Sequence, residues 1–271
     1  MSQGVLRILT ALVGIPALLA AIYAGSYWFG IVVGVIALAA AYEVGKLLES
    51  TGAKPIMLAG LALGALVLAR PWFLHWDAVA TIVFTATVLV TPGLRSEHPA
   101  ERLAATVFMA AYPVWLLSFL ILIREGAGMH VDSSQALWLT AMLFVVIWAA
   151  DTFAYYTGRL IGRTPFFPAV SPNKTWEGFF GGVVGAALAG ALIKQLQLPF
   201  LGWTDTILII LICGVLGPVG DLTESRLKRS AAAKDSGSLL PGHGGMLDRF
   251  DAMIVCAPLV WLYLAYLSGV R

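Results

Sequence analysis

Charged residues are scarce in this sequence. Asp, Glu, Lys and Arg make up 12% of its 271 residues, whereas a soluble domain usually contains about 25%. Hydrophobic residues make up 59%, and the mean hydropathy is +0.87. Most of the chain therefore has too little polar surface to face water, which excludes an ordinary soluble globular protein. Segments that cross a bilayer must satisfy their own backbone hydrogen bonds, and runs this apolar fit helices rather than barrel strands.

Two further absences exclude particular kinds of site. The chain has only two cysteines, Cys213 and Cys256, and both lie inside apolar runs. We expect them to be small buried residues rather than a disulfide or a metal-binding pair. The Gly-x-x-x-x-Gly-Lys-Ser/Thr pattern is also missing, which excludes a phosphate-binding loop of the Walker type.

The sequence is rich in apolar stretches close to the ~20 residues that a helix needs to cross the hydrocarbon core. Their number predicts an all-α polytopic membrane protein with about nine transmembrane helices. The predicted helices are residues 5–24, 27–47, 55–69, 76–91, 104–123, 136–157, 178–197, 204–221 and 250–268. Glycines four residues apart, at Gly30/Gly34, Gly60/Gly64 and Gly181/Gly185, indicate close packing between these helices.

The lysines and arginines favour one orientation of the spans, because basic residues gather in cytoplasmic loops. With nine spans and a cytoplasmic N-terminus, 13 of the 17 lysines and arginines lie on the cytoplasmic side. The other four are Arg70, Arg124, Lys194 and Arg271. Merging the short third and fourth segments into one span weakens this bias. The sequence therefore predicts nine spans, with the N-terminus in the cytoplasm and the C-terminus in the periplasm.

The stretch Thr223–Asp251, which we interpret as a loop between two apolar helices, is unusually rich in charge. It holds nine of the 32 charged residues of the chain in 29 positions. The two signs are mixed, whereas a polybasic membrane anchor has no use for aspartates. This composition indicates chemistry rather than membrane attachment.

Three aspartates at this end of the chain form a candidate metal site. Asp248 and Asp251 are three residues apart at the start of the last predicted helix, so both carboxylates lie on one helix face. Asp221, at the end of the preceding helix, belongs to the same predicted membrane face. Oxygen ligands of this kind suit Mg²⁺, which proteins hold through one or two carboxylates and substrate phosphates.

The same stretch carries features that suit a phosphate-rich ligand. Gly242, Gly244 and Gly245 surround His243 just before the last helix, where glycines allow close backbone approach and free N–H groups can bind an anion. Several basic side chains offer positive charge to a polyphosphate. These are Lys228, Arg229, Lys234 and Arg249.

A second polar stretch, Ser171–Gly178, lies on the same predicted face. Thr175 is placed to cap the helix that follows, with Lys174 near the N-terminus of that helix. Upstream, Asp151 lies within an apolar helix, where an acidic residue is by default a hypothesis for a functional site. Glu43 is a weaker case of the same kind, since Lys46 at i+3 can pair with it.

Each of these features also has a simpler explanation. An Asp-x-x-Asp pair at a helix start often only stabilises the helix dipole. A single histidine is more often structural than catalytic, and basic loop residues usually set topology. The functional interpretation is favoured because all of these residues crowd into one short stretch of a chain that has little charge elsewhere.

The arrangement of residues 225–251 resembles the signature of the phosphatidate cytidylyltransferases, or CDP-diacylglycerol synthases. It consists of Ser225-Arg-Leu-Lys-Arg229, then Lys234-Asp235-Ser-Gly237, then Leu240-Pro-Gly-His-Gly-Gly-Met-Leu-Asp-Arg-Phe-Asp251. The match covers 27 residues with fixed spacing, and Ser171–Gly178 resembles a second characteristic stretch of that family. The resemblance extends over the whole chain, although the first four helices are generic.

The resemblance implies an enzyme that transfers a cytidylyl group from CTP to phosphatidic acid and releases pyrophosphate. It implies Mg²⁺ as cofactor, with K⁺ as a candidate second cation, and a homodimer in the bacterial inner membrane with its site on the cytoplasmic face. No nucleic-acid partner is expected. The implied organisation is a single transmembrane domain over residues 1–271, with generic helices in 1–123 and the catalytic portion in 136–271.

The candidate site residues are assigned to three roles. The metal ligands are Asp221, Asp248 and Asp251. The candidate catalytic residues are Lys228, Arg229, Lys234, Asp235, His243 and Arg249. The candidate substrate-binding residues are Asp151, Ser171, Lys174, Thr175, Gly244 and Gly245.

Three other functions compete with this assignment. A CTP-dependent lipid kinase would use the same nucleotide and metal but would release CDP. An alcohol phosphotransferase that consumes CDP-diacylglycerol would need a longer aspartate pattern, which is not found in the sequence. A transporter would use Asp151 and Glu43 to line a pathway, but the apolar segments show no inverted repeat.

Overall fold

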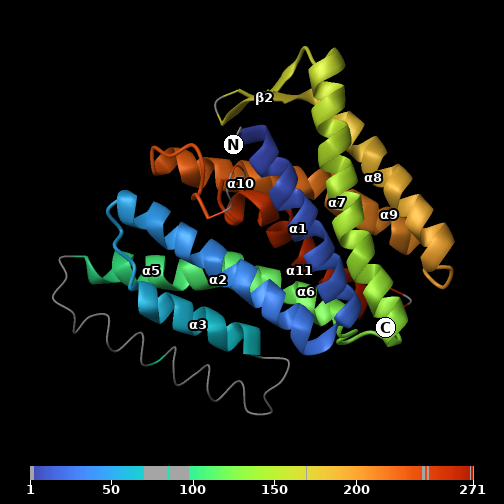
Figure 1. The fold of residues 1–271 in the computed structure, drawn as a ribbon, viewed down its shortest axis with the longest axis horizontal. Helices are drawn as coiled ribbons and strands as arrows, with labels where there is room; N and C mark the ends of the chain where they lie inside the picture. The colour runs from blue at the N-terminus through green and yellow to red at the C-terminus, as the bar shows by residue number, and fades with distance from the viewer. Residues whose placement is uncertain are drawn as a thin grey trace. The chain divides into compact units, whose positions relative to one another are not determined.

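The computed structural model describes residues 3–69, 85, 98–168, 170–239, 242, 244–268 and 270, and most of them are helical (Figure 1). The helices are α1 (Gln3–Ala24), α2 (Ser26–Ser50), α3 (Met57–Ala69), α5 (Pro99–Met109), α6 (Leu116–Arg124), α7 (Ser133–Ile161), α8 (Trp176–Gln197), α9 (Trp203–Leu211), α10 (Gly217–Ser230) and α11 (Leu247–Tyr266). Two π-helical turns, η2 (Ala110–Trp115) and η3 (Ile212–Leu216), join α5 to α6 and α9 to α10. The predicted helical membrane architecture is confirmed, with a small antiparallel hairpin of β1 (Pro165–Phe167) and β2 (Ser171–Thr175) that was not predicted.

Eight of the nine predicted segments coincide with helices, and the fourth, 76–91, lies outside the described residues except for residue 85. Six helical stretches of the described chain are long and apolar enough to cross a membrane. They are Tyr27–Ser50, Pro99–Arg124, Ser133–Ile161, Trp176–Gln197, Trp203–Ser230 and Leu247–Tyr266. Leu12–Ala24 and Met57–Ala69 are shorter apolar helices. The chain is therefore an integral membrane protein with several spanning helices.

The charged loop is shorter than the sequence suggested, and the prediction that it extends over Thr223–Asp251 was wrong. Helix α10 continues to Ser230 and α11 begins at Leu247. The polar end of α10 is packed into the protein rather than solvated as a loop, since Glu224 and Lys228 are both buried. The hydroxyl of Ser230 also donates to a helix carbonyl, that of Leu227, at 2.8 Å. High charge was therefore a poor guide to where the helix ends.

The chain divides into two compact units. The first comprises Met1–Leu18, Tyr27–Ile121 and Leu227–Arg249, and the second comprises Leu19–Ser26, Leu122–Arg226 and Phe250–Arg271. The division passes through α1, α6, α10 and α11 and separates Ser26 from the rest of α2.

The first unit packs α3 against α5 and η2 around the buried side chain of Met109. A Cβ atom at Gly60 would lie 2.5 Å from the sulfur of Met109, and one at Gly64 would lie 3.0 Å from Val114. The prediction of close packing at Gly60 and Gly64 is therefore confirmed. The start of α3 is also tied to α5, because the hydroxyl of Thr106 accepts a hydrogen bond from the N–H of Ile56 at 2.8 Å.

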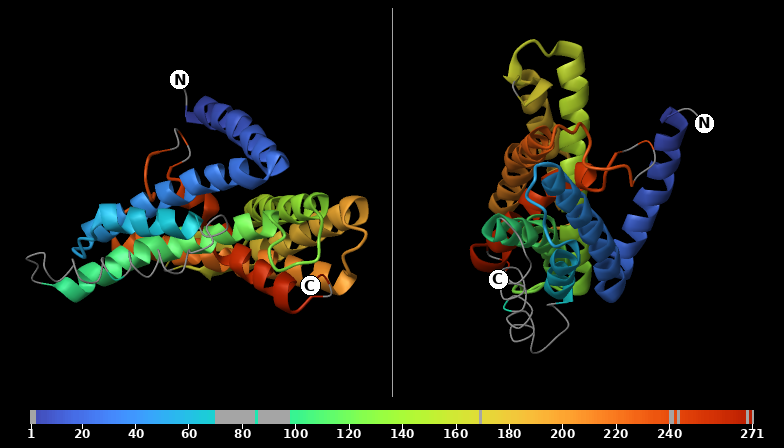
Figure 2. Two further views of the ribbon diagram at one scale, coloured as in Figure 1. Left: turned by 90° about the horizontal axis from the view of Figure 1, so that it is seen from below. Right: turned by 90° about the vertical axis from the view of Figure 1, so that its left-hand side faces the viewer.

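The second unit is built on α7 and α8, which run side by side in opposite directions (Figures 1 and 2). A Cβ atom at Gly185 would lie 2.8 Å from the carbonyl oxygen of Ala149, and one at Gly181 would collide with Thr157. The glycine pair at 181 and 185 therefore allows close helix packing, as predicted. The two cysteines of the chain also lie in this unit, where both are buried and free, as the sequence indicated.

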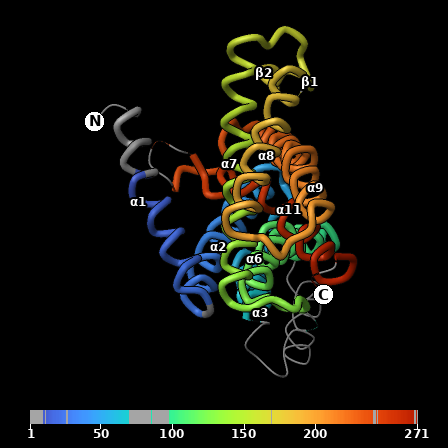
Figure 3. The backbone as a smooth tube through the Cα atoms, turned by 90° about the vertical axis from the view of Figure 1, so that its right-hand side faces the viewer, coloured from blue at the N-terminus to red at the C-terminus, as the bar shows by residue number. Residues whose placement is uncertain are grey.

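The hairpin of β1 and β2 connects α7 to α8 at one end of this helix pair (Figure 3). Thr175 is the N-cap of α8, and its hydroxyl accepts a hydrogen bond from the N–H of Gly178 at 3.2 Å. The predicted capping role of Thr175 is thus confirmed. Because Lys174 directly precedes Thr175 on β2, this cap also fixes the backbone of Lys174 beside the start of α8.

Candidate metal and phosphate site

Three carboxylates of the second unit come together in what we call the acidic cluster: Asp221 and Glu224 of α10 and Asp251 of α11. One oxygen atom from each lies within 4.8 Å of the others. Glu224 is only 1% exposed, whereas Asp221 and Asp251 are partly exposed. A set of three oxygen ligands from side chains suits a hard divalent cation.

A glycine lets the two helices bring these carboxylates together. A Cβ atom at Gly220 would collide with the backbone carbonyl oxygen of Asp251. Glycine at this position therefore permits the backbones of α10 and α11 to approach each other, directly beside Asp221. Glu224 follows Asp221 by three residues and so lies on the same helix face.

Two polar side chains outside the acidic cluster contact Asp221. The ammonium of Lys174, on β2, forms an ion pair with Asp221, and the hydroxyl of Ser225 donates to the same carboxylate at 3.2 Å. Asp151 lies on α7 of the same unit, where it is exposed. Three residues that were predicted for the site, Lys174, Asp221 and Asp251, therefore come together in this unit.

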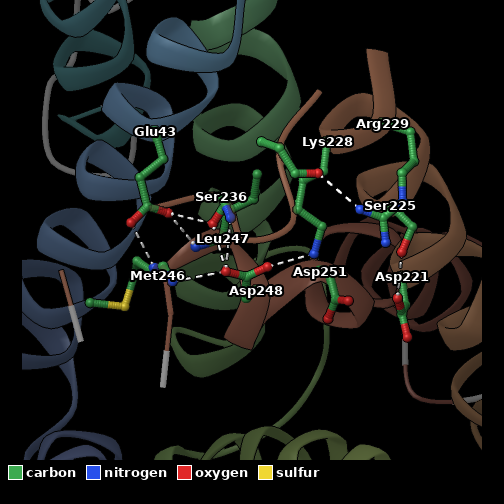
Figure 4. A network of polar contacts seen from close by, with 12 residues as sticks. Glu43, Asp221, Ser225, Lys228, Arg229, Ser236, Met246, Leu247, Asp248 and Asp251 are labelled. Carbon is green, nitrogen blue, oxygen red and sulfur yellow. Dashed lines mark hydrogen bonds and ion pairs between the residues drawn. The ribbon is translucent and has the colours of Figure 1, made fainter. Parts of the chain in front are cut away.

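The first unit holds a second group of polar contacts, which we call the turn network, around Asp248 (Figure 4). One oxygen of Asp248 accepts from the ammonium of Lys228 at 2.6 Å. The other accepts from the N–H of Ser236 at 3.0 Å and from that of Gly245 at 2.8 Å, and lies 3.0 Å from the Ser236 hydroxyl. The Lys228 and Asp248 side chains are 11% and 9% exposed, so this ion pair is buried.

The N–H groups at the start of α11 donate to carboxylates of the chain itself. Gly245 donates to Asp248, while Met246 and Leu247 donate to Glu43 at 2.9 Å each. The sequence suggested that this helix start offers free N–H groups to an anion, and these three groups already have acceptors. The suggestion that Lys46 pairs with Glu43 was wrong, because Lys46 forms an ion pair with Glu49 at 2.8 Å on the exposed face of α2.

The remaining candidate residues lie on exposed or turn positions. Arg229 is exposed and donates to the carbonyl oxygen of Ala233 at 2.9 Å. Lys234, Asp235 and Arg249 are exposed as well, and Ser171 is partly buried on β2. Gly242 and Gly244 have φ values of +78° and +80°, a conformation that favours glycine. His243 lies outside the described residues.

Sequence reasoning missed several members of both groups. Glu224 was counted only as part of a charged stretch, although its spacing from Asp221 could have placed it on the same helix face. Ser225 and Ser236 belong to the motif but were given no role. Glu43 was assigned a local partner, and nothing in its own neighbourhood indicates a contact with residues about 200 positions later.

Comparison with known proteins identifies the family. A profile described as the cytidylyltransferase family matches residues 5–267. The chain belongs to this family. A phosphatidate cytidylyltransferase from Synechocystis sp. is 30% identical over 287 aligned residues, which cover 97% of this chain and 97% of that protein.

Other relatives with the same name align over shorter regions. The phosphatidate cytidylyltransferase of Bacillus subtilis is 46% identical over 127 residues, which are 46% of each protein. That of Brucella abortus is 39% identical over 160 residues, or 59% of this chain and 56% of the relative. The chain thus matches about half the length of these two relatives.

Proposed function

We propose that this protein is a phosphatidate cytidylyltransferase, which transfers a cytidylyl group from CTP to phosphatidic acid for phospholipid synthesis. The observation that carries the proposal is the acidic cluster, which lies beside Lys174 in a membrane protein of the cytidylyltransferase family. The names of its relatives support the same substrates.

The chemistry that this function requires agrees with the groups present. A phosphate oxygen of phosphatidic acid forms a bond to the α-phosphorus of CTP, while the bond from that phosphorus to the bridging oxygen breaks and pyrophosphate leaves. The attacking oxygen is already an anion, so no general base is needed. Rate enhancement then depends on positioning and on neutralising negative charge.

We propose Mg²⁺ as the cofactor, with K⁺ as a candidate second cation. The donor set fits, because the acidic cluster offers three carboxylates in which oxygen atoms lie within 4.8 Å of one another. Asp221 and Asp251 were predicted as ligands, and Glu224 joins them. Asp248 stays a predicted ligand, and its carboxylate is held by Lys228 and Ser236 in the structure. When bound, the ion would neutralise charge on the CTP phosphates.

The basic residues are proposed to bind the phosphates of the two substrates. Lys228, Arg229, Lys234 and Arg249 would stabilise the leaving pyrophosphate or the lipid phosphate. The reacting groups would also be lined by Asp235, His243, Gly244 and Gly245. In the second unit, Asp151, Ser171, Lys174 and Thr175 are proposed to contact CTP or the lipid phosphate. Thr175 would do so in addition to capping α8.

We further propose nine transmembrane helices in a single domain over 1–271, with the catalytic portion in 136–271. The N-terminus would be cytoplasmic and the C-terminus periplasmic. The basic residues of the sequence support this orientation, which would expose the site to CTP on the cytoplasmic face of the bacterial inner membrane. A homodimer is the proposed assembly, and no nucleic-acid partner is proposed.

The deciding experiment supplies purified protein with CTP, phosphatidic acid and Mg²⁺ and measures pyrophosphate together with the lipid product. We expect pyrophosphate and CDP-diacylglycerol in equal amounts. Release of CDP would indicate a lipid kinase instead. No reaction, combined with solute uptake by protein reconstituted in liposomes, would indicate a transporter.

A further inference from the structure

Glu43 is a buried carboxylate that the proposed chemistry does not use. It lies in the apolar helix α2 and is 2% exposed. A buried carboxylate is costly unless hydrogen-bond donors surround it. The nearby Lys46 does not supply them, since it pairs with Glu49 on the exposed side of the helix.

The donors come instead from the loop and helix start some 200 residues later. One oxygen of Glu43 accepts from the N–H of Met246 at 2.9 Å, and the other accepts from the N–H of Leu247 at 2.9 Å. The second oxygen also lies 3.0 Å from the hydroxyl of Ser236. The first N–H groups of a helix have no partner within the helix, so Glu43 caps α11 from another part of the chain.

Two glycines make room for this carboxylate. A Cβ atom at Gly237 would lie 2.5 Å from one oxygen of Glu43. A Cβ atom at Gly245 would collide with the other oxygen and with the hydroxyl of Ser236. The loop therefore encloses the Glu43 carboxylate on two sides, and a side chain at Gly237 or Gly245 would push the loop away from this carboxylate.

The residues that Glu43 holds are those that orient Asp248. The N–H of Ser236 and the N–H of Gly245 both donate to Asp248, whose other oxygen accepts from Lys228. The Ser236 hydroxyl contacts Glu43 and Asp248 at 3.0 Å each, and a hydroxyl has one proton to donate. The two carboxylates therefore share one serine and one turn of backbone.

We propose that Glu43 is a positioning residue for the cytidylyl transfer. Its carboxylate fixes Ser236 and the turn at residues 245–247, and through them the orientation of Asp248 and Lys228. This role rests on the proposed function, because Asp248 and Lys228 are the groups that it assigns to the metal and the phosphates. Partners of this kind commonly contribute about 10- to 100-fold to activity or metal affinity.

The test replaces Glu43 by Gln, which has nearly the same shape but keeps only one acceptor oxygen and places an NH₂ group against a backbone N–H. We expect the turnover of folded Glu43→Gln to fall by about 10- to 100-fold. We also expect faster amide hydrogen exchange in peptides covering residues 236–247, with unchanged exchange in α7 and α8. Glu49→Gln, which changes an exposed carboxylate of the same helix, should match the wild type in both measurements.

A second variant approaches the same contact from the loop. Gly237→Ala should displace the Glu43 carboxylate and give the same pair of changes, while Gly14→Ala, which has nothing within 4 Å of its new methyl group, should not. The proposal is overturned if exchange in 236–247 stays at the wild-type level, or if it rises while turnover is kept. It is also overturned if exchange rises equally throughout the protein, since Glu43 would then serve only general stability.

The exchange measurement separates this proposal from the proposed function. If the wild type makes no pyrophosphate, the proposed function fails. If the wild type is active and Glu43→Gln retains both its turnover and its loop protection, only the role of Glu43 fails.

Discussion

Asp251 is the residue whose surroundings bear most directly on metal binding. Its carboxylate lies close to two other acidic side chains, and the backbone of α11 at this position is pressed against Gly220. Three carboxylates in such proximity repel one another, so a divalent cation placed among them would be strongly attracted. Lys174 already supplies one positive charge through its ion pair with Asp221.

Asp251→Asn should therefore weaken Mg²⁺ binding and lower the rate of pyrophosphate release by about 100-fold or more. Residues that only hold a metal ligand in place contribute about 10- to 100-fold, and loss of a ligand itself should cost at least as much. A ligand that binds only the folded state raises its melting temperature. We expect Mg²⁺ to raise the melting temperature of the wild type and to leave that of Asp251→Asn nearly unchanged.

The matched control is Asp132→Asn, which makes the same chemical change at an exposed N-cap of α7. Asn caps helices about as well as Asp, so this variant should keep both activity and the response to Mg²⁺. Full turnover by Asp251→Asn would remove that residue from the metal site. Applying the same pair of measurements to Asp248→Asn tests the third predicted ligand.

At the scale of elements, the close packing of α7 and α8 sets the position from which the hairpin and Lys174 extend. Gly185 is where α8 approaches the backbone of α7 most closely, because a Cβ atom added there would lie 2.8 Å from the carbonyl oxygen of Ala149. Alanine normally favours a helix over glycine by about 1 kcal/mol, whereas overpacking costs about 1–3 kcal/mol. The two effects oppose each other at this position.

Gly185→Ala should consequently lower the free energy of unfolding by up to about 2 kcal/mol, the overpacking cost less the gain in helix propensity. Gly14→Ala should leave it unchanged or raise it slightly, since nothing lies within 4 Å of the added methyl group. Thermal or denaturant unfolding in detergent measures both. A Gly185→Ala protein as stable as Gly14→Ala would show that the two helices can separate without cost.

For the whole molecule, the orientation of the helices in the membrane determines whether the proposed site faces the cytoplasm. Position 130 precedes α7 and position 235 lies in the loop between α10 and α11, and both side chains are exposed. The proposed topology places them on opposite sides of the membrane. Single cysteines at these positions therefore report the orientation directly.

We expect an impermeant maleimide added to intact cells to label His130→Cys but not Asp235→Cys, which should react only after the membrane is permeabilised. Replacing the buried Cys213 and Cys256 by alanine removes any background. Labelling of position 235 from outside, with protection of position 130, would invert the topology.

Local patterns in the sequence determined a large part of this protein. Apolar runs located eight helical segments that the structure describes, because burying apolar side chains in lipid or protein depends on composition over ~20 residues. Asp248 and Asp251 lie in the first turns of α11, near the start that the apolar run indicated, and Thr175 caps α8 as its position indicated. Residues within a few positions of one another are enough to specify such features.

Only the tertiary structure decided which distant residues meet. Glu43 contacts Met246 and Leu247, 203 and 204 positions later, and this contact rather than Lys46 satisfies its buried charge. Gly220 lets α10 approach α11 so that Glu224 joins Asp221 and Asp251. Such contacts depend on how helices pack and on which buried polar groups lack a local partner. Neither property can be read from the residues that neighbour Glu43 or Glu224 in the sequence.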